Sequence, residues 1–332
     1  MVRISGVAIS KYERDLDMPG SGVLMRLCQA LDLSLERLFR STAVVLSEPT
    51  YCKHLDLSLK DCKAIMAAVQ GEAERYSEAE ELVQHHERLK LPALSVTDAM
   101  DVEKAAERLR AEWCIGLDAI SSMVALLEDH DIQVVELDSN YDFDVCALDS
   151  DGRPFIVVRA EAPADRVRFT LAHELAHLVL THPSGKLPER LANRFAGAFL
   201  VPGDTAFREL GEHRDHLSAV ELQWLKTRYG FTMSAWIRRA GDLKIISIAE
   251  KTRWAKKLNQ LGWSVEEPSC GLSPEKPQRM ERMVVRAYAE GEVTGTRAAE
   301  LLGWSLERIL ADGHSWRNMP LAAEPQNTSY HP

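Results

Sequence analysis

The stretch RFTLAHELAHLVLTHP, residues 168–183, carries His173 and His177 four positions apart, with Glu174 directly after the first histidine. On an α-helix, positions four apart project from nearly the same side, so two ring nitrogens could reach one metal ion. This is the H-E-x-x-H arrangement, in which the histidines bind zinc and the glutamate acts as general base. The stretch therefore predicts a zinc site on a helix. The alternative is a packed helix that carries two buried histidines.

The residues that follow supply a candidate third ligand. The segment THPSGKLP, with two prolines and a glycine, predicts the end of the first helix. Pro188 suits the first turn of a second helix, ERLANRFAGAFL, from whose start Glu189 can reach back to the metal. Asn193 lies four residues further on the same face and could hydrogen-bond a ligating histidine. Two histidines and one glutamate leave a fourth position open for water, which is typical of catalytic rather than structural zinc sites.

Upstream segments indicate the fold around this site. Two helices and then three strands are expected, and the Asp-Gly step of DSDG predicts a hairpin between the last two strands. The segments are DAMDVEKAAERLRAEW, DAISSMVALLEDH, IQVVEL, DFDVCAL and PFIVVRA. We expect a mostly helical α+β protein. A small antiparallel sheet should pack on the zincin-type helix, and helical domains should flank this core.

The pair RFTLAHELAHLVL and ERLANRFAGAFLVP resembles the ImmA/IrrE family of bacterial metallopeptidases, and the resemblance covers roughly residues 98–204. It extends more weakly through GWSVEEP and RAYAEGEVTGTRAAELLGWS. The resemblance implies a gluzincin-like metallo-endopeptidase with one Zn²⁺ per chain. It assigns the zinc ligands to His173, His177 and Glu189, and the catalytic glutamate to Glu174.

Three positions depart from the pattern of that family. Ala176 stands where a glycine is usual, and Leu191 stands where a second acidic residue is common. Glu189 is thus the one candidate third ligand. A histidine that often follows the motif by four residues is here five residues on, at His182, and a regular helix would turn it away from the metal.

The amino-terminal residues carry a second resemblance. ISGVAISKYERD, a turn and then VLMRLCQALDLSLERLF are similar to the back half of an Xre/Cro-type helix-turn-helix domain, with ISKYER in its recognition helix. Family members often join such a domain to the peptidase. This implies that the substrate is an Xre-type transcriptional repressor, whose cleavage would derepress stress, prophage or defence genes. The alternative for this segment is three short helices that pack on the next domain.

Charge and hydropathy restrict the partners. The formal net charge of −10 gives no overall attraction to nucleic acid, so any contact with DNA would be local and weak. No apolar run approaches the roughly 20 residues of a membrane span, and MVRISGVAISKYERD lacks the apolar core of a secretion signal. We therefore expect a cytoplasmic protein with a protein substrate and with neither a membrane nor a nucleotide partner.

Other side chains are candidates for supporting roles. A Cys146 thiolate could fill the open zinc position and keep the enzyme latent, and Cys270 could do the same, although burial as small hydrophobic residues is the alternative for both. The strand PFIVVRA could pair with an extended substrate. The side chain that stabilises the oxyanion is left open among three candidates: Tyr141, Arg168 and His182.

Composition and helix signals divide the chain into five predicted parts. These are a partial helix-turn-helix at 1–46, a helical linker at 47–97, the metallopeptidase core at 98–215, a helical region at 216–320 and a disordered tail at 321–332. In the helical region, Ser218 and Glu221 form a predicted capping box, and Arg238 and Arg239 are expected to be exposed.

Two other functions remain open at this stage. One is a non-proteolytic helix-turn-helix regulator or antitoxin-like module, with a structural or latent zinc site. The other is a peptidase of broad specificity.

Overall fold

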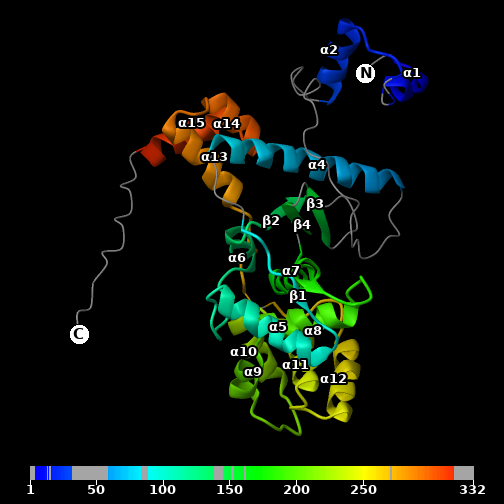
Figure 1. The fold of residues 1–332 in the computed structure, drawn as a ribbon, viewed down its shortest axis with the longest axis vertical. Coiled ribbons are helices and arrows are strands. Elements are labelled where there is room, and N and C mark those ends of the chain that lie inside the picture. Colours follow the sequence, from blue (N-terminus) through cyan, green and yellow to red (C-terminus); the bar gives the residue numbers. More distant parts are fainter. Residues whose placement is uncertain are drawn as a thin grey trace, which may run out of the picture. The chain divides into compact units, whose positions relative to one another are not determined.

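The computed structural model describes residues 4–12, 14, 16–31, 59–83, 89–137, 145–150, 153–160, 162–269 and 271–317. The chain divides into two compact units, Met1–Val45 and Leu46–Pro332, and each is described by itself (Figure 1). Several predictions lie outside the described residues: the third of the three short amino-terminal helices, the Asp-Gly turn, Tyr141, Cys270 and the tail.

The first unit contains helix α1, Gly6–Tyr12, and helix α2, Ser21–Leu31. The hydroxyl of Ser5 accepts a hydrogen bond from the amide of Ala8 at 3.3 Å, as expected of a residue that caps a helix. Cys28 is buried, whereas Val7, Leu16 and Met18 are exposed. These elements agree with the two predicted helices, but they do not test the Xre-type assignment, which stays a prediction.

The second unit begins with helix α4, Leu59–Leu82, and short strand β1, Leu94–Ser95. Helix α5, Ala99–Glu112, follows, and the carboxylate of Asp98 accepts hydrogen bonds from the amides of Met100 and Asp101 at its start. Helix α6, Met123–Asp129, is capped by Ser122. Helices α7, Ala164–Val179, and α8, Glu189–Leu200, then pack closely on each other and, with α5, form the centre of the hydrophobic core.

The main sheet is mixed, so the prediction of an antiparallel sheet is wrong. Its order is β2–β4–β3, with β2 Gln133–Leu137, β3 Val145–Ser150 and β4 Arg153–Arg159. The β3–β4 pair is antiparallel, as the hairpin signal predicted, but β2 lies on the other edge of β4 and runs parallel to it. A turn signal sets the direction of the two strands it joins and does not determine which edge a third strand takes. A separate two-stranded sheet pairs β1 with β5, Leu180–Thr181, in parallel.

The helical region follows the core. It contains α9 Gly203–Leu210, α10 Ala219–Tyr229, α11 Met233–Asp242 and α12 Ile248–Gln260. The capping box of Ser218 and Glu221 is present at α10, as predicted. Arg238 is exposed, but Arg239 is only 1% exposed, so the prediction that both arginines are exposed is wrong for the second.

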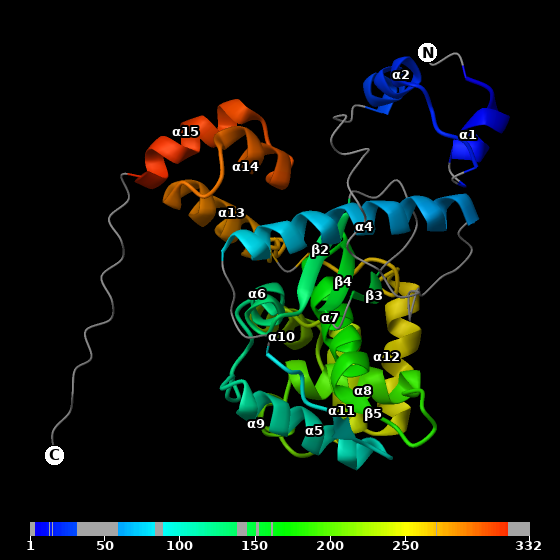
Figure 2. The same cartoon turned by 45° about the horizontal axis from the view of Figure 1, so that its top comes forward.

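The last described helices are α13 Arg279–Glu290, α14 Gly295–Leu302 and α15 Leu306–Arg317. They pack on one another, and α13 and α14 also contact α4, around a second small hydrophobic cluster (Figure 2). None of the helices in the described part of the chain is long and apolar enough to cross a membrane.

Candidate metal centre

Helices α7 and α8 bring the candidate ligands together. The two helices contact each other, and Ala172, Ala176, Ala192 and Ala196 on them are fully buried in the core, where such small side chains leave room for close packing. The connection at 182–188 reverses the chain, and Pro188 directly precedes the first helical residue of α8. The start of α8 therefore lies beside the second half of α7.

Three donor groups converge at this place. The Nε2 atoms of His173 and His177 are 3.3 Å apart. The carboxylate oxygens of Glu189 lie 3.1 Å from Nε2 of His173 and 3.7 Å from Nε2 of His177. All the donor atoms lie within 4.8 Å of one another, and these three residues form a group that could hold a metal ion.

The spacing fits one tetrahedral ion. Two nitrogens that each lie about 2.05 Å from a tetrahedral zinc ion are roughly 3.3 Å apart, which is the separation found between the two imidazoles. Imidazole and carboxylate ligands suit zinc and several other divalent metals. The residues present therefore fit a divalent ion with three protein ligands.

Exposure differs among the three ligands. The side chains of His173 and His177 are 5% and 4% exposed, whereas that of Glu189 is 46% exposed. The histidines are therefore fixed within the fold, and the glutamate forms the side that faces solvent. Glu174, next to His173 on α7, is buried. An ion held here would be reachable from solvent on the glutamate side.

The predicted supporting residues lie elsewhere or make other contacts. The Asn193 side-chain amide donates to the backbone carbonyl of Glu189 at 2.8 Å, so this bond holds the first turn of α8 and not a histidine ring. The His182 ring contacts the hydroxyl of Ser184 at 2.7 Å within the connecting turn. The side chain of Cys146 lies outside what the structure describes, so its role as a latent ligand stays a prediction.

Arg168 cannot serve as the oxyanion residue. It is buried and forms an ion pair with Glu275 at 3.0 Å, and it donates to the carbonyl oxygens of Tyr229 and Ile120. Five residues separate it from His173, so it projects from the opposite side of α7. Its interactions anchor α7 to neighbouring segments.

A charged cluster that the sequence did not reveal holds the middle of α8. Arg194 forms an ion pair with Glu103 of α5 and donates to the carbonyl of Asp242 at 3.0 Å. Arg239 donates to the same carboxylate at 2.8 Å and to the carbonyl of Val201 at 2.9 Å. Burial raises the pKa of Glu103, but the bonds from Arg239 and Arg194 outweigh burial and hold that pKa below its usual value.

Comparison with known proteins agrees with this geometry. The model of the M78 peptidase family described as an IrrE N-terminal-like domain matches residues 127–240, which include all three donor residues and Glu174. Residues 127–240 are an IrrE N-terminal-like domain. The prediction of a metallopeptidase is confirmed by this domain, and His173, His177 and Glu189 are consistent with its HExxH-plus-glutamate site. No curated protein matches the chain significantly.

The IrrE N-terminal-like domain covers about a third of the chain and does not include residues 1–46. The predicted helix-turn-helix, DNA binding and transcriptional regulation therefore gain no support from this comparison. The domain also does not identify the metal or the substrate.

Proposed function

We propose that the protein is a zinc-dependent endopeptidase that hydrolyses a peptide bond in a protein partner. The observation that carries this proposal is the spacing of two imidazoles and one carboxylate, which fits a single tetrahedral ion, within a metallopeptidase domain. We further propose that the partner is an Xre-type transcriptional repressor, cut to derepress stress, prophage or defence genes. Its support is the resemblance of residues 98–204 to the ImmA/IrrE family.

In this proposal His173, His177 and Glu189 hold one zinc ion. When bound, zinc would supply Lewis acidity, which lowers the pKa of water to about 7 and polarises a carbonyl group. The neighbouring carboxylate of Glu174 takes the proton from the attacking water and passes it to the leaving amine. Glu174 directly follows the first ligand on α7 and is buried, which supports this role for its carboxylate.

The sheet suggests how an extended substrate would bind. The expectation that β4 pairs with substrate is wrong, because its backbone already bonds to β2 and β3. Strand β3 is an edge strand of the sheet formed by the described strands, and it contacts α7. We therefore propose that the substrate adds as a strand at the outer edge of β3, where its backbone would gain hydrogen bonds.

A comparison of new protein amino termini tests the function. Host lysate is treated with zinc-loaded wild-type protein, with Glu174→Gln or with Glu107→Gln, which alters an exposed glutamate of α5. One or a few cuts should appear with the wild type and Glu107→Gln and be lost with Glu174→Gln, while zinc content stays equal. If a cut that depends on Glu174 lies in an Xre-type repressor, that repressor is identified as the substrate.

Two results would contradict the proposal. Identical termini in all three samples, with zinc bound, would support a non-proteolytic regulator that keeps a structural site. Many unrelated cuts would support a peptidase of broad specificity.

A further inference from the structure

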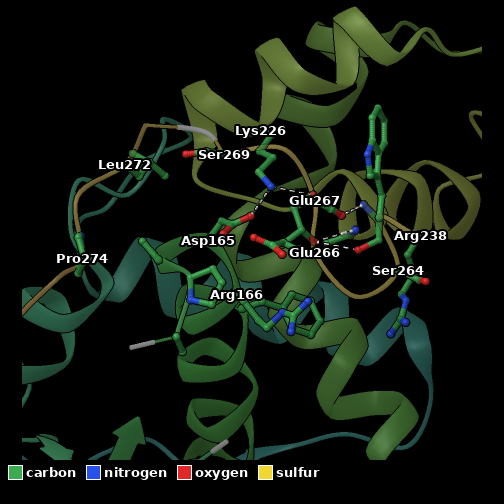
Figure 3. Close-up of a pocket in the computed structure, with 18 residues that line it drawn as sticks. Asp165, Arg166, Lys226, Arg238, Ser264, Glu266, Glu267, Ser269, Leu272 and Pro274 are labelled. Carbon is green, nitrogen blue, oxygen red and sulfur yellow. Dashed lines mark hydrogen bonds and ion pairs between the residues drawn. The ribbon is translucent and has the colours of Figure 1, made fainter. Parts of the chain in front are cut away.

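A cavity of about 670 Å³ lies at the amino-terminal end of α7 (Figure 3). Its lining comes from the first turns of α7, from α10 and α11, and from the segment between α12 and α13. Binding cavities for ligands commonly measure about 300–1,000 Å³, so this one is large enough for several residues of an extended peptide.

The buried charged groups of the cavity wall bind one another. Nζ of Lys226 lies 2.8 Å from Asp165 and 3.0 Å from Glu267, and Figure 3 shows its ammonium between the two carboxylates. Glu267 also accepts hydrogen bonds from the amides of Met233 and Ser234, at 2.8 and 2.9 Å. These groups hold α7, α10 and α11 together. Because they already bind one another, they contribute little to binding a ligand.

The part of the cavity left for a ligand has polar side chains, among them exposed Arg166, Arg238 and Glu266, and an apolar part formed by Phe169 and Trp263. Phe169 and Trp263 are both half-buried, and the ring of Phe169 packs 6.1 Å from that of buried Phe231. Ala235 and Leu272 complete this apolar lining. Half-buried aromatic side chains gain free energy when a ligand covers the rest of their surface, which favours a large apolar group.

The cavity and the metal centre share one side of α7. Phe169 lies four residues before His173, and Arg166 lies seven residues before it, so all three project from nearly the same side of the helix. Along this side Arg166 is exposed, Phe169 and Thr170 are half-buried, and the side chain of His177 is 4% exposed. The cavity therefore begins about 6 Å along the helix axis from the first metal ligand and continues away from it.

We propose that this cavity is the specificity pocket of the peptidase, and that it takes a large apolar or aromatic side chain of the substrate against Phe169 and Trp263. The inference rests on the proposed function. An extended chain advances about 3.3 Å per residue, so a substrate cut at the metal centre would place a residue two or three positions from the cut bond in the cavity.

An equimolar mixture of random decapeptides tests the pocket with two readouts. The first is the sequence around every bond that the zinc-loaded wild type cuts. The second is the set of peptides retained by immobilised, zinc-loaded Glu174→Gln, read by mass spectrometry. We expect large apolar residues to be enriched at one position, two or three residues from the cut, and also among the retained peptides.

Variants link this preference to the cavity. Phe169→Ala and Trp263→Ala should lower the apolar enrichment about tenfold or more, because each removes a large contact surface. Ser264→Trp fills the cavity from an exposed lining position and should have the same effect without removing a buried contact. Trp224→Ala, on an exposed tryptophan of α10 outside the cavity, is the matched control and should keep the enrichment.

The outcomes separate the two proposals. Cleavage that depends on Glu174 but shows no apolar preference, or a preference that the three cavity variants leave unchanged, would overturn the pocket and leave the peptidase standing. Absence of cleavage, together with apolar retention that the cavity variants abolish, would overturn the peptidase and support a peptide-binding pocket. Equal loss with Trp224→Ala would also overturn the pocket.

Discussion

Two polar clusters share helix α8 and differ in what completes them. At its start, Glu189 meets two imidazoles of α7, a set of donors that suits a metal cation. In its middle, Arg194 meets the carboxylate of Glu103, which also binds Arg239, so this cluster contains its own cations. The difference indicates that the cluster that contains its own cations stabilises the fold, and that the cluster of donors alone is suited to a metal ion.

The largest effect is expected when a donor of the first cluster is removed. His177→Ala should lower metal affinity by more than about 100-fold and abolish cleavage, because two ligands hold a divalent ion poorly. The measurements are metal content by mass spectrometry and the rate of peptide cleavage. His213→Ala, on an exposed histidine of a loop, is the control and should bind metal normally. Full metal occupancy in His177→Ala would show that His177 is not a metal ligand.

A change in the second cluster should instead lower the free energy of unfolding. Glu103→Ala leaves Arg239 buried without its carboxylate, and breaking such a pair costs about 3–5 kcal/mol of the free energy of unfolding. Glu107→Ala, on the exposed side of the same helix, should change it by less than about 0.5 kcal/mol. Urea unfolding measures both. If Glu103→Ala lost metal affinity but kept its stability, the division between the two clusters would be wrong.

The pH dependence of stability sharpens the same distinction. The pKa of Glu103 is held below its usual value of 4.5 in the folded protein, so its contribution is present above pH 4.5 and is lost as the pH falls through the folded pKa. In Glu103→Gln this part of the acid dependence should disappear. The difference in unfolding free energy between wild type and variant should thus shrink below pH 4.5. A constant difference down to pH 3 would contradict the assignment.

The smallest effect is expected at Asn193. Its amide binds the carbonyl of Glu189, so Asn193→Ala should lower stability by about 0.5–1.5 kcal/mol and change metal affinity by less than tenfold. A residue that orients a ligating histidine would instead change affinity by about 10–100-fold. A zinc titration of the variant therefore decides whether Asn193 supports the glutamate backbone or a histidine ring.

Local spacing was enough to predict that the three candidate metal ligands lie together. The four-residue separation of His173 and His177 and the breaks before Glu189 determine where the donors project, and the structure brings all three together. The helix start marked by Ser218 and Glu221 likewise follows from hydrogen bonds between residues close in sequence.

Features that depend on distant partners could not be predicted in this way. Arg239 looked exposed because its partner, Glu103, lies 136 residues away. The position of β2 beside β4 depends on packing of the whole core rather than on a turn. The cavity combines α7 with Trp263, and nothing in the spacing of either segment indicates the other.

The most direct test of the account is the X-ray absorption spectrum of the zinc-loaded protein. An open site made by His173, His177 and Glu189 predicts one zinc per chain with only nitrogen and oxygen ligands, at about 2.0–2.2 Å, and with two imidazole rings. A sulfur ligand at about 2.3 Å would contradict the open site and would place a cysteine, such as Cys146, on the metal.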